Sequence, residues 1–113
     1  MTLVNARTHE TIASAVTLAV TRSERRRGLL GRGAFDRSEA LVLSPCWAIH
    51  TMFMRFAIDV VFVDREGRAV RLVHSLAPWR MAAAPRAHAT IELPAGSLRG
   101  RDVLVGDQFL TTV

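Results

Sequence analysis

Alternating apolar and polar side chains predict that most of this chain forms β-strands. In residues 14–20, Val16, Leu18 and Val20 alternate with smaller or polar neighbours, which is the period-two pattern of a half-buried strand. Residues 57–63 form the clearest strand of the chain, because six of these seven residues are apolar. The same reasoning predicts further strands over residues 2–6, 40–43, 68–76, 88–93, 103–105 and 108–112.

The most secure local structure is a hairpin around residues 64–67. These residues read Asp-Arg-Glu-Gly, which is turn chemistry with glycine at a position that accepts a positive φ. We therefore expect residues 68–76 to return antiparallel to residues 57–63.

A single short helix is expected over about residues 22–30. Thr21 and Glu24 have the spacing of a capping box, in which each side chain bonds the other's backbone N–H, and Gly31 provides a stop. Gly28 lies inside this span and weakens the helix by about 1 kcal/mol relative to alanine.

Two segments fit neither the helical nor the strand period. The apolar residues of Cys46–Arg55 have no regular spacing, so we expect an irregular segment packed across the core. Residues 76–87 carry two prolines and are expected to form a loop. Many short strands with one helix predict a single domain, residues 1–113, that is mainly β: a small antiparallel β sandwich or partly closed barrel with one short helix near residues 22–30.

The charge of the chain raises the question of an anionic partner. The net charge is +5 and all 15 basic residues are arginines, which bind phosphate and carboxylate in a bidentate manner. The arginines are scattered, with one cluster at Arg25–Arg27, and no recognised motif accompanies them, so we do not expect nucleic acid as a partner. An arginine-only composition is also typical of a solvated surface shaped by genomic base bias.

Cellular location is inferred from what the sequence does not contain. No apolar run approaches the roughly 18 residues of a membrane-spanning helix, and Arg7, His9 and Glu10 interrupt any signal-like segment. The single cysteine is compatible with a reducing compartment. We expect a cytoplasmic protein that does not cross a membrane.

Candidate chemistry centres on two acids within apolar strands, Asp59 and Glu92. A buried carboxylate is costly without a partner, so two on adjoining strands could mark one end of a pocket. The ligand-binding candidates are His50, Thr51, Arg55, Asp59 and Glu92, with Met54 and Trp79 at the pocket rim. The alternative is that Asp59 only accepts backbone hydrogen bonds or pairs with Arg55 to hold the Cys46–Arg55 segment.

Two further arrangements have simpler explanations. Cys46, His50 and Asp59 are the residue types of a nucleophile, its base and an orienting acid, but a buried cysteine and a backbone-bonded histidine explain them equally. Cys46 and His50 with His74 or His88 lack the paired spacing of a structural zinc site. We expect neither a metal nor another cofactor.

Four motifs in order along the chain resemble one family. They are GLLGR at 28–32, CWAIHTMFMRFAIDVVFVDREGRAV at 46–70, ELPAG at 92–96 and VGD at 105–107. Together they resemble the prokaryotic domain of unknown function 192, over about residues 16–109. Many members carry tryptophan where this chain has Phe53, so a contact made by that indole is not carried over to this chain. The resemblance implies a compact β-rich fold and no assigned activity.

Three functions remain open on the sequence alone, and whether the chain is an enzyme is one of the open questions. The leading hypothesis is a binding module for a small polar or anionic ligand, a sugar being one candidate. The second is a hydrolase or transferase that uses Asp59 or Glu92 as general base. The third is an interaction domain whose methionine- and tryptophan-bearing loops contact a protein partner. The sequence does not determine the oligomeric state.

Overall fold

A computed structural model describes residues 1–113 and confirms a mainly β fold with one short helix. The strands form a five-stranded sheet in the order β3-β4-β9-β6-β7, a three-stranded sheet β10-β1-β2 and a pair β5-β8. The elements are β1 (Thr2–Asn5), β2 (Thr11–Ala13), β3 (Ala15–Ala19), α1 (Arg22–Arg27), β4 (Glu39–Leu43), β5 (Ala48–His50), β6 (Ile58–Val63), β7 (Ala69–Leu76), β8 (Met81–Ala83), β9 (Ala89–Pro94) and β10 (Phe109–Thr112).

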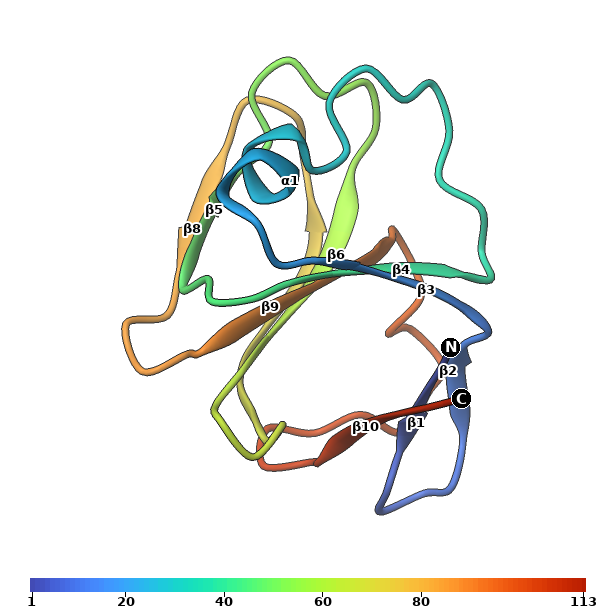
Figure 1. The fold of residues 1–113 in the computed structure, drawn as a ribbon. Coiled ribbons are helices and arrows are strands. Elements are labelled where there is room, and N and C mark those ends of the chain that lie inside the picture. The colour runs from blue at the N-terminus through green and yellow to red at the C-terminus, as the bar shows by residue number, and fades with distance from the viewer.

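The five-stranded sheet lies between two layers. In Figure 1 its strands β3, β4 and β9 run across the middle, with α1 and β5-β8 on one side and the three-stranded sheet on the other. Every residue of β6 and β9 is buried, because both faces of these central strands are covered. The two layers therefore enclose two separate apolar cores, one on each face.

Strand parity decides which core each side chain enters. Val61, Ile91 and Leu93 join the core under β1, β2 and β10. Val60 and Phe62 join the core under α1 and β5-β8. Successive residues of a strand point to opposite faces, so neighbours in the sequence of β6 or β9 lie in different environments.

One strand pair departs from the predicted antiparallel arrangement. β3 and β4 are parallel, with Ala15 opposite Glu39, whereas β4, β9, β6 and β7 pair antiparallel. The connection from β3 to β4 contains α1 and a long loop, and a parallel pair needs such a crossover to return the chain to the same end of the sheet. The predicted strand at 14–20 corresponds to β3, which begins after Ser14. The preceding strand β2 was not predicted, because it is too short for its alternation to be recognised.

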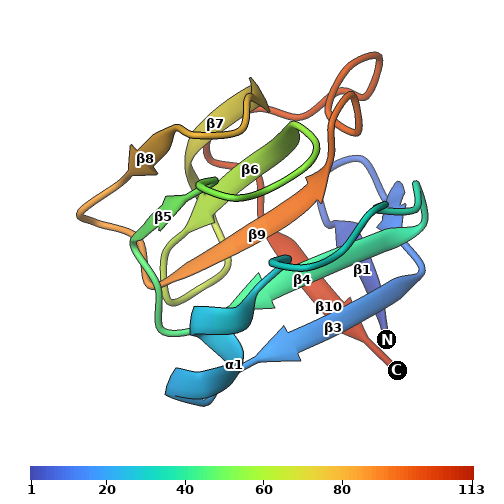
Figure 2. The same cartoon turned by 90° about the horizontal axis from the view of Figure 1, so that it is seen from above.

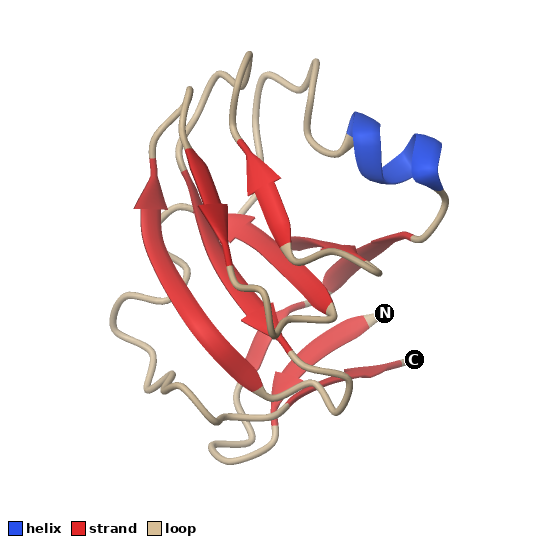
Figure 3. Ribbon diagram, turned by 90° about the vertical axis from the view of Figure 1, so that its left-hand side faces the viewer, coloured by secondary structure: helices blue, strands red, loops and turns tan.

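The predicted capping box is present. The Thr21 hydroxyl accepts the Glu24 N–H at 3.1 Å and the Glu24 carboxylate accepts the Thr21 N–H at 3.0 Å. The helix is shorter than predicted, because Gly28 adopts a φ of 46° and caps it after Arg27. α1 is the single helix in Figure 3 and buries none of its residues, and no helix is long and apolar enough to cross a membrane.

The two segments predicted to be irregular pair with each other. Within them, β5 and β8 are antiparallel, with His50 opposite Met81. Thr51 joins their ends: its hydroxyl donates to the Ala77 carbonyl at 2.6 Å and accepts the Arg80 N–H at 2.9 Å. Three-residue strands are too short to show a period, which is why neither was predicted. Residues 103–105, by contrast, were predicted as a strand and form none.

The predicted hairpin is confirmed and supplies a test of backbone geometry at Gly67. Gly67 has a φ of +80°, and a Cβ there would lie 2.6 Å from the Phe109 carbonyl oxygen. We expect Gly67→Ala to lower the free energy of unfolding by at least about 2 kcal/mol, because strain and a backbone clash add.

Gly96 is the matched control for this change. It has a φ of +88°, and a Cβ added there would have no atom within 4 Å, so Gly96→Ala should cost only about 1 kcal/mol from the left-handed conformation itself. Urea melts of both variants measure the difference. Equal costs would mean that the approach of β10 does not constrain the turn.

Candidate functional site

Asp59 lies on the face of the sheet that packs against β1, β2 and β10, and both oxygens of its carboxylate accept backbone hydrogen bonds. Its side chain is 0% exposed. Its two oxygens accept the N–H groups of Ser75 at 2.8 Å and Leu98 at 2.9 Å. The carboxylate thus links β6 to β7 and to the turn after β9, which is the structural role given above as the alternative for this acid.

Glu92 lies on the opposite face of the sheet, which packs against α1 and the β5-β8 pair. It stands opposite Val60 in the β6–β9 register, whereas Asp59 stands opposite Leu93. The two carboxylates are close in the sheet but separated by it, so they do not line one pocket. This geometry differs from the expectation that both mark one end of a site, because the register between strands is not readable from either strand alone.

The Glu92 carboxyl has no protein partner. Its side chain is 4% exposed, and burial alone raises its pKa from 4.5 to about 7. No arginine contributes to this shift, so no guanidinium group lies in direct contact with the carboxyl. No fully buried side-chain nitrogen or oxygen lacks a hydrogen-bond partner, so the unbonded Glu92 oxygens reach solvent in spite of the low exposure of the residue. An acid with a raised pKa that still reaches solvent is a candidate functional group.

Glu92 lines a cleft of about 480 Å³ between α1 and β5. One wall is the helix and the two leucines that follow it, and the other is the segment from Pro45 to His50. Figure 2 shows α1 and β5 flanking the same end of the central sheet. The further lining residues are Leu43, Met54 and Glu92.

Four arginines of α1 line the cleft: Arg22, Arg25, Arg26 and Arg27. The Arg25 guanidinium already has a hydrogen-bond partner, since it lies 3.5 Å from the Ser44 carbonyl oxygen. The other three take part in none of the ion pairs of the protein. The cleft therefore combines three guanidinium groups that form no ion pair with one carboxyl group, that of Glu92, which can be protonated near neutral pH.

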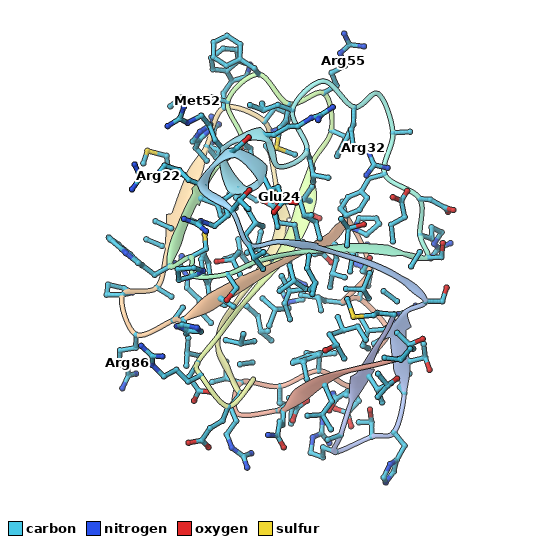
Figure 4. The ribbon with its side chains drawn as sticks, viewed as in Figure 1. Arg22, Glu24, Arg32, Met52, Arg55 and Arg86 are labelled. Atoms are coloured by element: carbon cyan, nitrogen blue, oxygen red, sulfur yellow. The ribbon has the colours of Figure 1, made fainter.

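The other predicted site residues fall into two groups. His50 and Met54 line the cleft beside Glu92. Thr51 is buried at the junction of β5 and β8, and Trp79 packs against Phe53 with ring centroids 4.6 Å apart. Arg55 points outward at the end of the molecule that also carries Met52 (Figure 4) and does not pair with Asp59.

The thiol, imidazole and carboxylate considered as a catalytic set are not brought together. Cys46 and His50 both line the cleft, and the Cys46 thiol donates to the Ala48 carbonyl at 3.2 Å. Asp59 is on the other face of the sheet. No group of three or more His, Cys, Asp or Glu side chains is placed to hold a metal ion.

Sequence reasoning does not identify the cleft wall formed by α1. Arg25–Arg27 stand out as a cluster, but nothing in the sequence connects Arg22 or Trp47 to Glu92. The one signal in the sequence is the helix itself, which has no apolar face and therefore leaves most of its arginines exposed. Which groups these arginines face is decided only by the tertiary fold.

The two acids predict losses of stability of different size on substitution by alanine. Asp59→Ala leaves the buried Leu98 N–H without an acceptor, so we expect a loss of about 2–4 kcal/mol in the free energy of unfolding. Glu92→Ala removes a group with no partner and should cost less, even after the lost packing. Urea melts at pH 7 compare them, and a larger cost at Glu92 would contradict these assignments.

The raised pKa of Glu92 predicts a specific pH dependence. An acid whose pKa rises from 4.5 to about 7 on folding destabilises the fold progressively between these two values and by a constant amount above them. We expect Glu92→Gln to match the wild type near pH 4 and to exceed its stability by about 3 kcal/mol at pH 8. Glu66→Gln, at an exposed position, is the control, and a pH-independent difference would contradict the shift.

Comparison with known proteins agrees with this fold. A chain from Sinorhizobium meliloti described as a candidate transcription regulator superposes with a TM-score of 0.82 at 20% identity, covering 96% of this chain and 89% of that one. A protein of unknown function from Novosphingobium aromaticivorans gives a TM-score of 0.80 at 19% identity, covering 97% and 82%. At such identities these structures show the fold alone.

Sequence comparison supplies the family. The UPF0127 protein PF1050 of Pyrococcus furiosus is 39% identical over 63 residues, which are 55% of this chain and 53% of that protein. The matched part thus spans about half the length of this relative. The family model DUF192, described as "Uncharacterized ACR, COG1430", matches residues 3–110. The chain therefore belongs to the DUF192 family.

Proposed function

We propose that this domain binds a small anionic ligand in the cleft between α1 and β5. The observation that carries the proposal is Glu92, a residue only 4% exposed whose carboxyl accepts no hydrogen bond from the protein and lines a cleft that Arg22, Arg26 and Arg27 also line. Binding sites typically combine an apolar lining with a few convergent polar groups, and half of the residues lining this cleft are hydrophobic.

The two ends of the cleft favour different chemical groups. Guanidinium groups bind phosphate or carboxylate in a bidentate manner, so the arginines favour the anionic end of a ligand. Glu92 favours a hydroxyl, because a carboxyl near its pKa can accept or donate a hydrogen bond to it. A hydroxylated acid or a sugar phosphate has both groups, and Trp47 at the cleft wall offers an apolar surface to its carbon skeleton.

A second candidate is acid–base catalysis on such a ligand. The observation that favours it is the pKa of Glu92, about 7, which is where a general base or acid is most effective at neutral pH. Asp59 is not placed for this role, because both of its oxygens accept backbone hydrogen bonds on the other face of the sheet. The catalytic candidate therefore reduces to Glu92.

A thermal-shift panel tests the binding proposal. We would compare inorganic phosphate, glycolic and tartaric acids, sugar phosphates and the corresponding neutral sugars. A ligand at 100 times its Kd should stabilise the domain by about 2.7 kcal/mol. We expect sugar phosphates to shift the melting temperature more than neutral sugars do.

Three variants assign any shift to the cleft. Arg22→Gln combined with Arg26→Gln, and separately Glu92→Gln, should reduce the ligand-induced shift, whereas Arg99→Gln, outside the cleft, should not. A shift retained in both cleft variants, or lost equally in the control, would contradict the proposed site. Conversion of the bound compound, followed by NMR and abolished by Glu92→Gln, would favour the catalytic candidate.

A further inference from the structure

Four large apolar side chains project from one end of the β5-β8 pair. They are Met52, Phe53, Trp79 and Met81, and we call them the apex. Phe53 is 71% exposed, Trp79 55% and Met81 70%. Phe53 and Trp79 pack against each other, with ring centroids 4.6 Å apart. Single exposed apolar residues are common on protein surfaces, but a group of large ones at one end of a strand pair is typical of a contact surface.

Two of these residues adopt a backbone conformation that is unfavourable for them. Phe53 has a φ of 65° and Trp79 a φ of 64°, in the left-handed region that bulky residues rarely occupy. Glycine or asparagine would occupy these positions at lower cost. Burial does not explain the aromatic side chains, since both are more than half exposed. Stability of the fold alone therefore does not account for aromatic residues at these two positions.

The apex is held rigidly by buried hydrogen bonds. Thr51 is 0% exposed, and its carbonyl accepts the N–H groups of Trp79 at 3.0 Å and Met54 at 3.2 Å. Its hydroxyl bonds both sides of the opposite turn, at Ala77 and Arg80. These bonds fix the conformation of the two turns that carry Phe53 and Trp79. The exposure of both rings therefore follows from the folded backbone.

The segments that carry the apex contain basic residues and no acidic ones. Residues 40–58 and 67–91, which contain β5, β8 and both turns, include no aspartate or glutamate. Arg55 and Arg80 flank the apex and take part in none of the ion pairs. In Figure 4 Met52, Arg55 and Arg22 lie toward the same end of the molecule. By contrast, Glu10, Asp102 and Asp107 pair with arginines near β1.

The shape of this surface distinguishes between anionic partners. A single nucleic-acid strand is bound in a basic groove with open aromatic faces. None of the four apex residues lines either of the two main hollows, the two rings pack against each other, and half of the apex side chains are thioethers. Projecting indole, phenyl and thioether groups edged by arginine match the interfacial region of a bilayer.

We propose that the apex docks on the surface of an anionic lipid bilayer. Phe53, Trp79 and the two methionines enter the headgroup region, while Arg55 and Arg80 contact lipid phosphates. His50 lies opposite Met81 and also lines the cleft, so the cleft opens beside the docked surface. This inference is independent of the ligand proposed for the cleft.

Vesicle co-sedimentation tests the inference with phosphatidylcholine vesicles, with and without phosphatidylglycerol. We expect binding to the anionic vesicles that weakens as salt rises, and at least tenfold weaker binding to the neutral ones. In a Trp47→Phe variant the emission of Trp79 should shift to shorter wavelength on binding. Absence of binding to anionic vesicles at low salt would overturn the proposal.

The left-handed positions allow a variant that removes the apex without damaging the fold. Phe53→Asn with Trp79→Asn should reduce vesicle binding at least tenfold while leaving the melting temperature unchanged or higher, because asparagine tolerates this φ. Leu104→Asn is the matched control and should bind as the wild type does, because this exposed leucine bonds Asp107, which in turn bonds Asn5 of β1 in the opposite layer.

Three other outcomes would also overturn the proposal. One is undiminished vesicle binding by the double asparagine variant. Another is apex-dependent binding of a single-stranded oligonucleotide in place of vesicles. The third is self-association in sedimentation velocity that the same variant abolishes, which would make the apex a contact between two copies of the chain.

Discussion

The register between β6 and β9 is the constraint on which the rest of this structure depends. Asp59 stands opposite Leu93, and Val60 stands opposite Glu92. This pairing sends one acid to each face of the central sheet. Slipping the register by one residue would exchange the faces of a whole strand, and would place an unpaired carboxyl in the core where Asp59 now finds two backbone donors. The two apolar cores on either side make that exchange costly.

The two acids illustrate how burial has different consequences in different surroundings. Asp59 is buried among backbone N–H groups of Ser75 and Leu98, which stabilise a carboxylate. Glu92 is 4% exposed and accepts no hydrogen bond from the protein, so desolvation raises its pKa to about 7. One acid therefore connects elements of the fold, and the other lines the cleft without a partner from the protein.

Both surfaces for which we propose a function lie on the layer formed by α1 and the β5-β8 pair. The helix carries arginines on a capped but otherwise unburied turn, and the strand pair carries the exposed rings of Phe53 and Trp79. In the opposite layer, by contrast, the buried acid has internal partners. Asp107 there accepts hydrogen bonds from Asn5 and Arg7, and the Arg7 guanidinium holds the pKa of the Asp107 carboxyl well below its usual range. These arginines without ion-pair partners and these exposed aromatic rings therefore lie on one layer of the domain.

The sequence by itself determined the elements whose signals are local. Thr21 and Glu24 specify the start of α1, Asp64 and Gly67 specify the hairpin turn, and the apolar runs specify β6 and β9, because capping, turn conformation and strand period each depend on residues close in the chain. The family was also evident from four motifs in order. Only the tertiary structure decided the rest. β5 pairs with β8 across the intervening β6-β7 hairpin. α1 lines the same cleft as Glu92 of β9, and Asp59 and Glu92 lie on opposite faces of the sheet. Each of these depends on register and long-range pairing, which no window of the sequence contains.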